Sequence, residues 1–207
     1  MESYPFNTEG LQQDAIDLYF DTYNELKSKL QLCHTGYIDF NLEHFEVFNN
    51  TIRMRVLASY AVKQANGNDC YVLFIEKHYK YIGEKGRTAE DDDYQTWVVA
   101  YLKNDFDRVL IRRETLTDKL LELVHPVELD FDDDKAFSDT FYVLVNDRNK
   151  ALRGIDRSFR NAVMDLRHDD ITIEIHGHTL IAGRQGAMMP GTAVHLAEFA
   201  ERLCKFC

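Results

Sequence analysis

The sequence contains no run of about 18 consecutive apolar residues, the length that a membrane-spanning helix requires. Its first residues, from Met1 to Asn7, lack the basic start and the apolar stretch of a secretory signal peptide. Cysteine is scarce, and the four cysteines follow no spacing that is typical of a disulfide framework. We therefore expect a soluble, cytoplasmic protein with reduced thiols and no membrane insertion.

Positive charge is also in short supply. The chain has 24 lysines and arginines against 35 aspartates and glutamates, so its formal net charge is -11. Nucleic acids and anionic membranes repel such a protein, and we expect neither to be its general partner. A length of 207 residues suits one domain with a sizeable core. We predict a single α+β domain over residues 1–207, with an N-terminal lobe at 1–94 and a C-terminal lobe at 95–207 as the alternative.

The strongest structural pattern lies between Phe137 and Gly186. The apolar run at residues 141–145 is typical of a strand, and the Asn-Asp pair that follows it is a helix-start signal. Apolar residues then recur every three or four positions, which predicts a long central helix at about residues 147–167. Beyond it, two short alternating runs meet at His176-Gly177-His178, which predicts a hairpin.

The rest of the chain supplies strands in groups rather than in strict alternation with helices. The other expected elements are, in chain order, a helix at 10–32, paired strands at 53–62 and 70–76, an exposed loop at 83–93, strands at 96–102 and 108–111, a helix at 114–124, a strand at 127–132 and a last helix capped by Thr192. This grouping favours an α+β fold. We predict an antiparallel-rich mixed sheet that is covered by the N-terminal, central and C-terminal helices.

The second half of the chain resembles a known protein family. The resemblance rests on hydrophobic spacing: Phe137-x3-Phe141-x-Val143, then Asp147, a helix ending in Leu166, and the hairpin at 171–181. This spacing is similar to the C-terminal part of a family of bacterial proteins of unknown function, in which a cytoplasmic α+β domain commonly follows N-terminal membrane helices. No membrane helix precedes the domain in this sequence. The resemblance implies the fold class and assigns no functional residue.

Two histidines form the most metal-like signal in the sequence. His176 and His178 would point to the same face of one strand, as two metal ligands must. At a hairpin turn, however, they would flank Gly177 as ordinary turn residues. A third ligand would have to come from elsewhere, with His168 and the neighbouring aspartates the nearest candidates. We expect no metal and no cofactor, and keep a small metal-assisted hydrolase that uses His176 and His178 as the alternative.

A basic ridge runs along the predicted central helix. Its members follow one another at helical spacing: Lys150, Arg153, Arg157 and Arg160. The ridge is either a binding surface for an anionic ligand or a solvated helix face, whose arginines pair with Asp156 or with the acidic turn at 130–134. The leading hypothesis for the whole chain is a non-enzymatic protein-interaction or regulatory module. We expect its partner to be another protein or a second copy of the chain.

Overall fold

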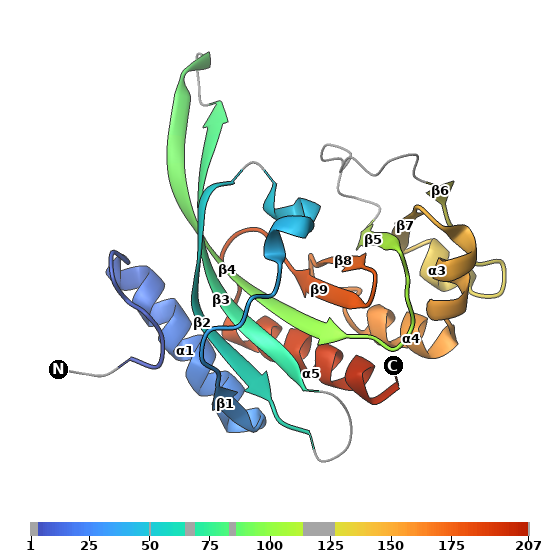
Figure 1. Cartoon of the computed structure of the whole chain (residues 1–207), viewed down its shortest axis with the longest axis horizontal. Helices are drawn as coiled ribbons and strands as arrows, with labels where there is room; N and C mark the ends of the chain where they lie inside the picture. Colours follow the sequence, from blue (N-terminus) through green and yellow to red (C-terminus); the bar gives the residue numbers. More distant parts are fainter. Residues whose placement is uncertain (1–3, 50, 65–68, 83–85, 114–126, 207) are drawn as a thin grey trace.

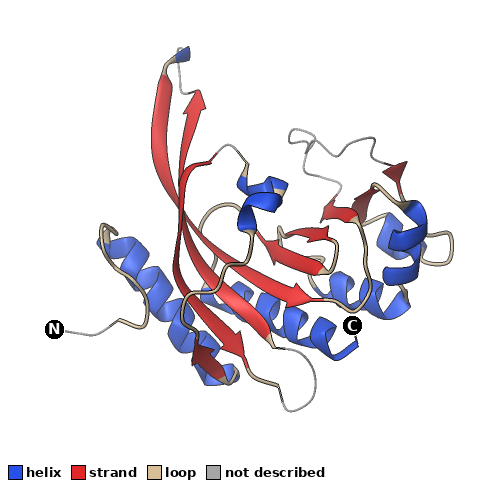
Figure 2. Cartoon of the chain, viewed as in Figure 1, coloured by secondary structure: helices blue, strands red, loops and turns tan. Residues whose placement is uncertain are grey.

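The computed structural model of the chain describes residues 4–49, 51–64, 69–82, 86–113 and 127–206. Within them the strands are β1 (Leu32–His34), β2 (Thr51–Val62), β3 (Cys70–Ile82), β4 (Thr88–Tyr101), β5 (Arg108–Arg113), β6 (Val127–Glu128), β7 (Phe141–Val145), β8 (Thr172–His176) and β9 (Thr179–Gly183). They form one nine-stranded antiparallel sheet in the order β1-β2-β3-β4-β9-β8-β5-β7-β6 (Figure 2). The predicted α+β class is confirmed, with a wholly antiparallel sheet in place of a mixed one.

Two long helices, α1 (Gln13–Lys29) and α5 (Pro190–Phe206), pack against each other beside the central strands (Figure 1). They cover one face of the sheet, because α5 contacts β3 and β4 and the apolar stripe of α1 reaches the same core. Tyr19 of α1 stacks on Phe74 of β3 with ring centroids 4.6 Å apart, and its hydroxyl donates a hydrogen bond to the Ile75 carbonyl at 2.7 Å. The predicted first helix is therefore confirmed as a core helix.

The opposite face of the central strands is covered by an irregular segment. Residues 38–48, which include the 3-10 helices η1 (Leu42–His44) and η2 (Glu46–Phe48), cross over the sheet here. Phe48 packs edge-on against the buried Trp97 of β4, with ring centroids 5.0 Å apart. The apolar run predicted as a buried strand at 96–102 lies in β4 up to Tyr101 with both faces covered, which explains why the run shows no alternation.

The predicted long central helix is wrong as a single element. The structure has two helices, α3 (Arg148–Gly154) and α4 (Arg157–Asp165). At the break, a Cβ on Gly154 would lie 2.3 Å from the Phe106 ring, so only glycine fits there. The Asp156 carboxylate then accepts a hydrogen bond from the Phe159 backbone N–H at 2.8 Å and caps α4. The apolar spacing hid this break because both helices face the same core.

The predicted exposed loop at 83–93 is wrong from residue 88 onward. Residues 88–93 belong to β4 and pair with the end of β3, and together they form an arm that projects from the body (Figure 1). Across the arm His78 lies 2.8 Å from Asp92, and Lys80 lies 3.0 Å from Glu90. Such cross-strand charge pairs stabilise a ladder that the local composition does not reveal. Strand β9 pairs with β4 only from Trp97 onward, so the outer edge of the arm is open within the described residues.

Of three other predicted elements, one is confirmed, one begins at a different residue and one lies outside the described residues. The hairpin turn at Gly177-His178 is confirmed, and Gly177 has a φ of +61°, in the left-handed region that favours glycine. The last helix begins at Pro190 rather than beyond Thr192, in agreement with the preference of proline for the first helical position. The helix predicted at 114–124 lies outside the described residues. No helix among the residues that the structure describes is long and apolar enough to cross a membrane.

Phe159 tests the packing of α4 on the sheet. Its side chain is 2% exposed and its ring centroid lies 5.6 Å from that of Phe106. Replacing it with alanine should lower the free energy of unfolding by about 3–5 kcal/mol, because a buried aromatic site is emptied. Leu152→Ala on the exposed side of α3 is the matched control, with an expected change within about 0.5 kcal/mol. Equal losses in the two variants, measured by urea unfolding, would contradict this packing.

Candidate functional site: a groove beside strand β2

The structure separates the four residues of the predicted basic ridge. Lys150 of α3 donates a hydrogen bond to the Asp105 carboxylate at 2.7 Å, and this contact raises the pKa of Lys150. Arg160 of α4 is only 5% exposed and pairs with Asp133 and Asp134 at 2.7 and 3.0 Å. Its guanidinium is therefore paired with the acidic turn at residues 130–134.

The other two members of the ridge, Arg153 and Arg157, lie on different helices and are exposed. Neither forms an ion pair among the residues that the structure describes.

The two histidines of the candidate metal pair contact different neighbours. His176 ends β8, and its ring lies 5.7 Å from that of His44, whereas the Nδ1 atom of His178 lies 3.2 Å from the Leu102 carbonyl oxygen. Burial and the nearby Arg108 lower the pKa of His176. Within the described parts of the chain, no three His, Cys, Asp or Glu side chains lie close enough to hold a metal ion. Sequence patterns did not predict the contact between His44 and His176, because the two residues are far apart in the sequence and only the fold brings them together.

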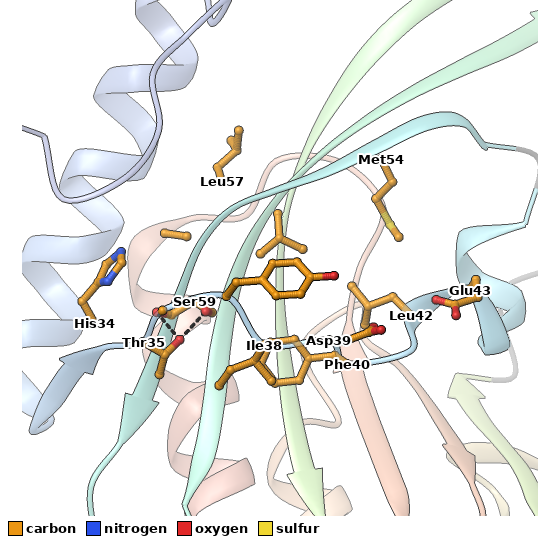
Figure 3. A pocket seen from close by; sticks show the side chains of 14 residues that line it. His34, Thr35, Ile38, Asp39, Phe40, Leu42, Glu43, Met54, Leu57 and Ser59 are labelled. Atoms are coloured by element: carbon orange, nitrogen blue, oxygen red, sulfur yellow. Dashed lines mark hydrogen bonds between the residues drawn. The ribbon is translucent and has the colours of Figure 1, made fainter.

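A groove lies between β2 and the segment that crosses the sheet. Its volume is about 480 Å³, and it is lined by residues 34–40, 42 and 43 on one side and by residues 54 and 56–59 of β2 on the other (Figure 3). Two lining residues expose apolar surface to solvent: Tyr37 is 94% exposed and Val56 is 43% exposed. The remaining apolar lining consists of Ile38, Phe40, Leu42, Met54, Leu57 and Ala58. We call this feature the β2 groove.

The chain enters the β2 groove from the short pairing of β1 with β2. Both the backbone N–H and the hydroxyl of Thr35 donate hydrogen bonds to the Ser59 carbonyl at 3.0 Å (Figure 3). The Asn7 N–H donates to the Leu57 carbonyl at 3.0 Å. Between Thr51 and Val56, the side of β2 that faces away from β3 receives no further backbone hydrogen bond from the described residues. The unpaired stretch of this edge thus meets the groove at Met54 and Val56, next to the Leu57 and Ser59 carbonyls that are already bonded.

Buried polar contacts fix the end of the crossing segment. Glu174 of β8 is 3% exposed, and its carboxylate accepts hydrogen bonds from the backbone N–H groups of Glu46 and Val47 at 2.9 and 3.1 Å. Arg108 of β5 pairs with the Glu46 carboxylate at 2.8 Å and also donates to the His44 carbonyl at 2.8 Å. These contacts hold η1 and η2 on the sheet and so set the position of one groove wall.

The charge on the groove is negative. Two of its lining residues, Asp39 and Glu43, are exposed carboxylates, and the part of the lining that the structure describes contains no lysine or arginine. Among the described residues that line the groove, His34 alone has a side chain that can become a cation. The groove therefore combines an apolar floor, an acidic rim and free backbone groups.

In fold and site, then, the chain is an α+β protein with a helix-covered antiparallel sheet and an open groove at one strand edge. No protein-family model and no curated protein sequence matches it. Among solved structures, it is similar to the crystal structure of the mycobacterial trehalose monomycolate transport factor A, TtfA, with a TM-score of 0.56 and 10% sequence identity. The similarity covers 89% of this chain and 91% of that chain. At this identity the two share a fold.

Glu174, which anchors the groove wall, should make the free energy of unfolding depend on pH. Burial raises its pKa from the ordinary 4.5 to about 6, against the opposing effect of the two backbone hydrogen bonds. Within this window the folded state binds more protons than the unfolded state, so stability falls as pH rises. The free energy of unfolding of the wild type, minus that of Glu174→Gln, should fall by about 2 kcal/mol from below to above the window. The exposed Glu43→Gln is the control, and a difference for Glu174→Gln that does not change with pH would contradict the assignment.

Proposed function

We propose that this chain is a single-domain, non-enzymatic protein-interaction module whose β2 groove binds an extended segment of another protein. The observation that carries the proposal is the solvent-open apolar floor beside an unpaired strand edge. An extended peptide can add to such an edge through backbone hydrogen bonds while alternate side chains enter the groove. Tyr37 supplies an exposed aromatic ring of the kind that anchors many interfaces.

The charge of the groove specifies the chemistry of its occupant. Asp39 and Glu43 attract a cation, and no lining lysine or arginine opposes it. We therefore expect an occupant that carries Lys or Arg beside apolar side chains. A second copy of this chain fits less well, because both partners would carry a net charge of -11. The volume of about 480 Å³ admits a few side chains, which suits a short linear segment.

A non-catalytic role agrees with the name of the structural neighbour, which is a transport factor. For the alternative of a metal-assisted hydrolase, the described residues contain no group of three His, Cys, Asp or Glu side chains that could hold a metal ion. A cytoplasmic location stays a prediction.

Selection of random decapeptides displayed on phage tests the proposal directly. The wild type should enrich sequences that alternate apolar residues with Lys or Arg, because the floor is apolar and the rim acidic. The double variant Asp39→Lys/Glu43→Lys should shift the enriched charge from basic to acidic, and Val56→Asp should reduce binding of the selected peptide at least tenfold. The matched control is Asp21→Lys/Glu25→Lys on the exposed side of α1. An identical consensus from the wild type and the rim variant would remove the groove as the binding site.

A second candidate function uses the two exposed arginines of the ridge to bind an anionic ligand. The supporting observation is that Arg153 and Arg157 are free of ion pairs within the described residues, whereas Lys150 and Arg160 are paired. Arg157→Glu should leave the free energy of unfolding within about 0.5 kcal/mol of the wild type, because the site is exposed. It should also weaken binding of a fluorescent Glu-rich decapeptide in a salt-dependent manner. Equal anisotropy titrations for the wild type, Arg157→Glu and the control Lys29→Glu would reject this function.

A further inference from the structure

A second cavity lies at the root of the arm, beyond the end of η2. Its volume is about 420 Å³, and its lining residues are Asn49, Lys77, Tyr79, Lys80, Asp93, Gln185 and Gly186. None of these residues lines the β2 groove. The cavity therefore requires its own explanation.

Lys77 is the unusual member of this cavity. Its side chain is among the buried charged groups of the protein, with 5% of the residue exposed. The described residues give its ammonium group one hydrogen bond, to the Val47 carbonyl at 3.3 Å. Burial lowers the pKa of Lys77, and the nearby Asp93 partly opposes this effect. Burying a charge with so few partners is costly, and an apolar side chain would fit this position at lower free energy. The amino group retains unused hydrogen-bond donors in the cavity wall.

Asp93 provides the opposite charge on the same wall. It lies directly across from Lys77 in the register of β3 and β4. Its Oδ2 atom accepts hydrogen bonds from the Gln95 side-chain amide at 2.6 Å and from the Gly186 N–H at 2.9 Å. Gln95 in turn accepts a hydrogen bond from the buried Trp97 indole at 2.7 Å. The Asp93 carboxylate is thus fixed from the core.

Lys77 and Asp93 nevertheless form no ion pair with each other, since no amine–carboxylate distance of 4.0 Å or less joins them among the described contacts. The ammonium of Lys80, the other lysine of the lining, is already paired with Glu90 at 3.0 Å. The cavity therefore presents one positive and one negative group that form no ion pair with each other among the described residues.

We propose that this cavity binds a small zwitterion that carries both a carboxylate and an ammonium group, of the free α-amino acid class. The ligand carboxylate pairs with Lys77 and accepts from the Asn49 amide, while its ammonium pairs with Asp93. A simple anion would meet the Asp93 charge, and a simple cation would meet Lys77. Only a ligand with both charges satisfies both groups. The Tyr79 ring offers an apolar wall for the ligand side chain, and the volume is within the range of small-molecule sites.

The experiment uses the full chain and the twenty free L-amino acids, each tested by thermal shift and by ligand-observed NMR. At least one amino acid should bind, and its methyl ester and its N-acetyl derivative should each bind at least tenfold more weakly. If the N-acetyl derivative binds as tightly as the free amino acid, the cavity is an anion site. If the methyl ester binds as tightly, the cavity is a cation site. If none of the twenty amino acids binds, the cavity is not a site for this class of ligand. Each of these three outcomes overturns the proposal.

Variants locate the binding. Lys77→Met and Asp93→Asn should each weaken binding of the best amino acid at least tenfold, whereas Lys63→Met, whose ammonium is paired with Asp69 outside this cavity, should bind like the wild type. Lys77→Met should melt at or above the wild-type temperature, because it removes a buried charge. Retained amino acid binding in Lys77→Met would overturn the assignment of the site. Val56→Asp in the β2 groove should not affect amino acid binding, so the two proposals can fail independently.

Discussion

The structure depends on one constraint: the central strands have two apolar faces, and both faces must be covered. Strands β3 and β4 carry large side chains on both sides, with Phe74 on one face and Trp97 on the other. Each buried aromatic of this size stabilises the fold by removing apolar area from water, so neither face can be left uncovered. Two long helices cover one face. The other face has no helix of comparable length in the described residues and is covered by the segment 38–48.

An irregular segment covers a sheet less uniformly than a helix does, and both candidate sites follow from that. The backbone groups of such a segment need partners, and Glu174 and Arg108 supply them from the sheet itself. The segment is thereby fixed over the middle of the sheet, while its entry beside β2 stays open as the groove. Beyond its far end, the cavity with Lys77 lies between η2 and the arm. Rigid anchoring in the middle thus leaves defined openings on either side.

Sequence patterns predicted the elements whose signals are local. Patterns among residues close together in the sequence predicted the apolar stripe of α1, the apolar run in β4 and the turn at Gly177. The acidic residues of the arm were assigned to a loop because nothing near them shows that His78 and Lys80 lie opposite. The alternating run that contains Glu174 gave no sign that this carboxylate is buried, because the crossing segment that covers it is far away in the sequence.

The candidate sites were beyond the reach of such patterns. Whether Tyr37 stays exposed or Lys77 becomes buried depends on contacts between residues far apart in the chain. Of the residues predicted for a site, Arg160 pairs with the acidic turn at 130–134, as one of the two interpretations of the ridge expected, whereas Lys150 pairs with Asp105, which neither interpretation named.

The open edge of the arm has a consequence for how copies of this protein meet. A long unpaired strand is a template on which a second sheet can grow, and proteins commonly guard such edges. Here the exposed edge of β4 carries Glu90, Asp91 and Asp92 in succession. Antiparallel docking of two arms would place carboxylates against carboxylates, which is unfavourable for directly opposed residues. The acidic side chains of the arm therefore oppose the continuation of its sheet into the arm of a second copy.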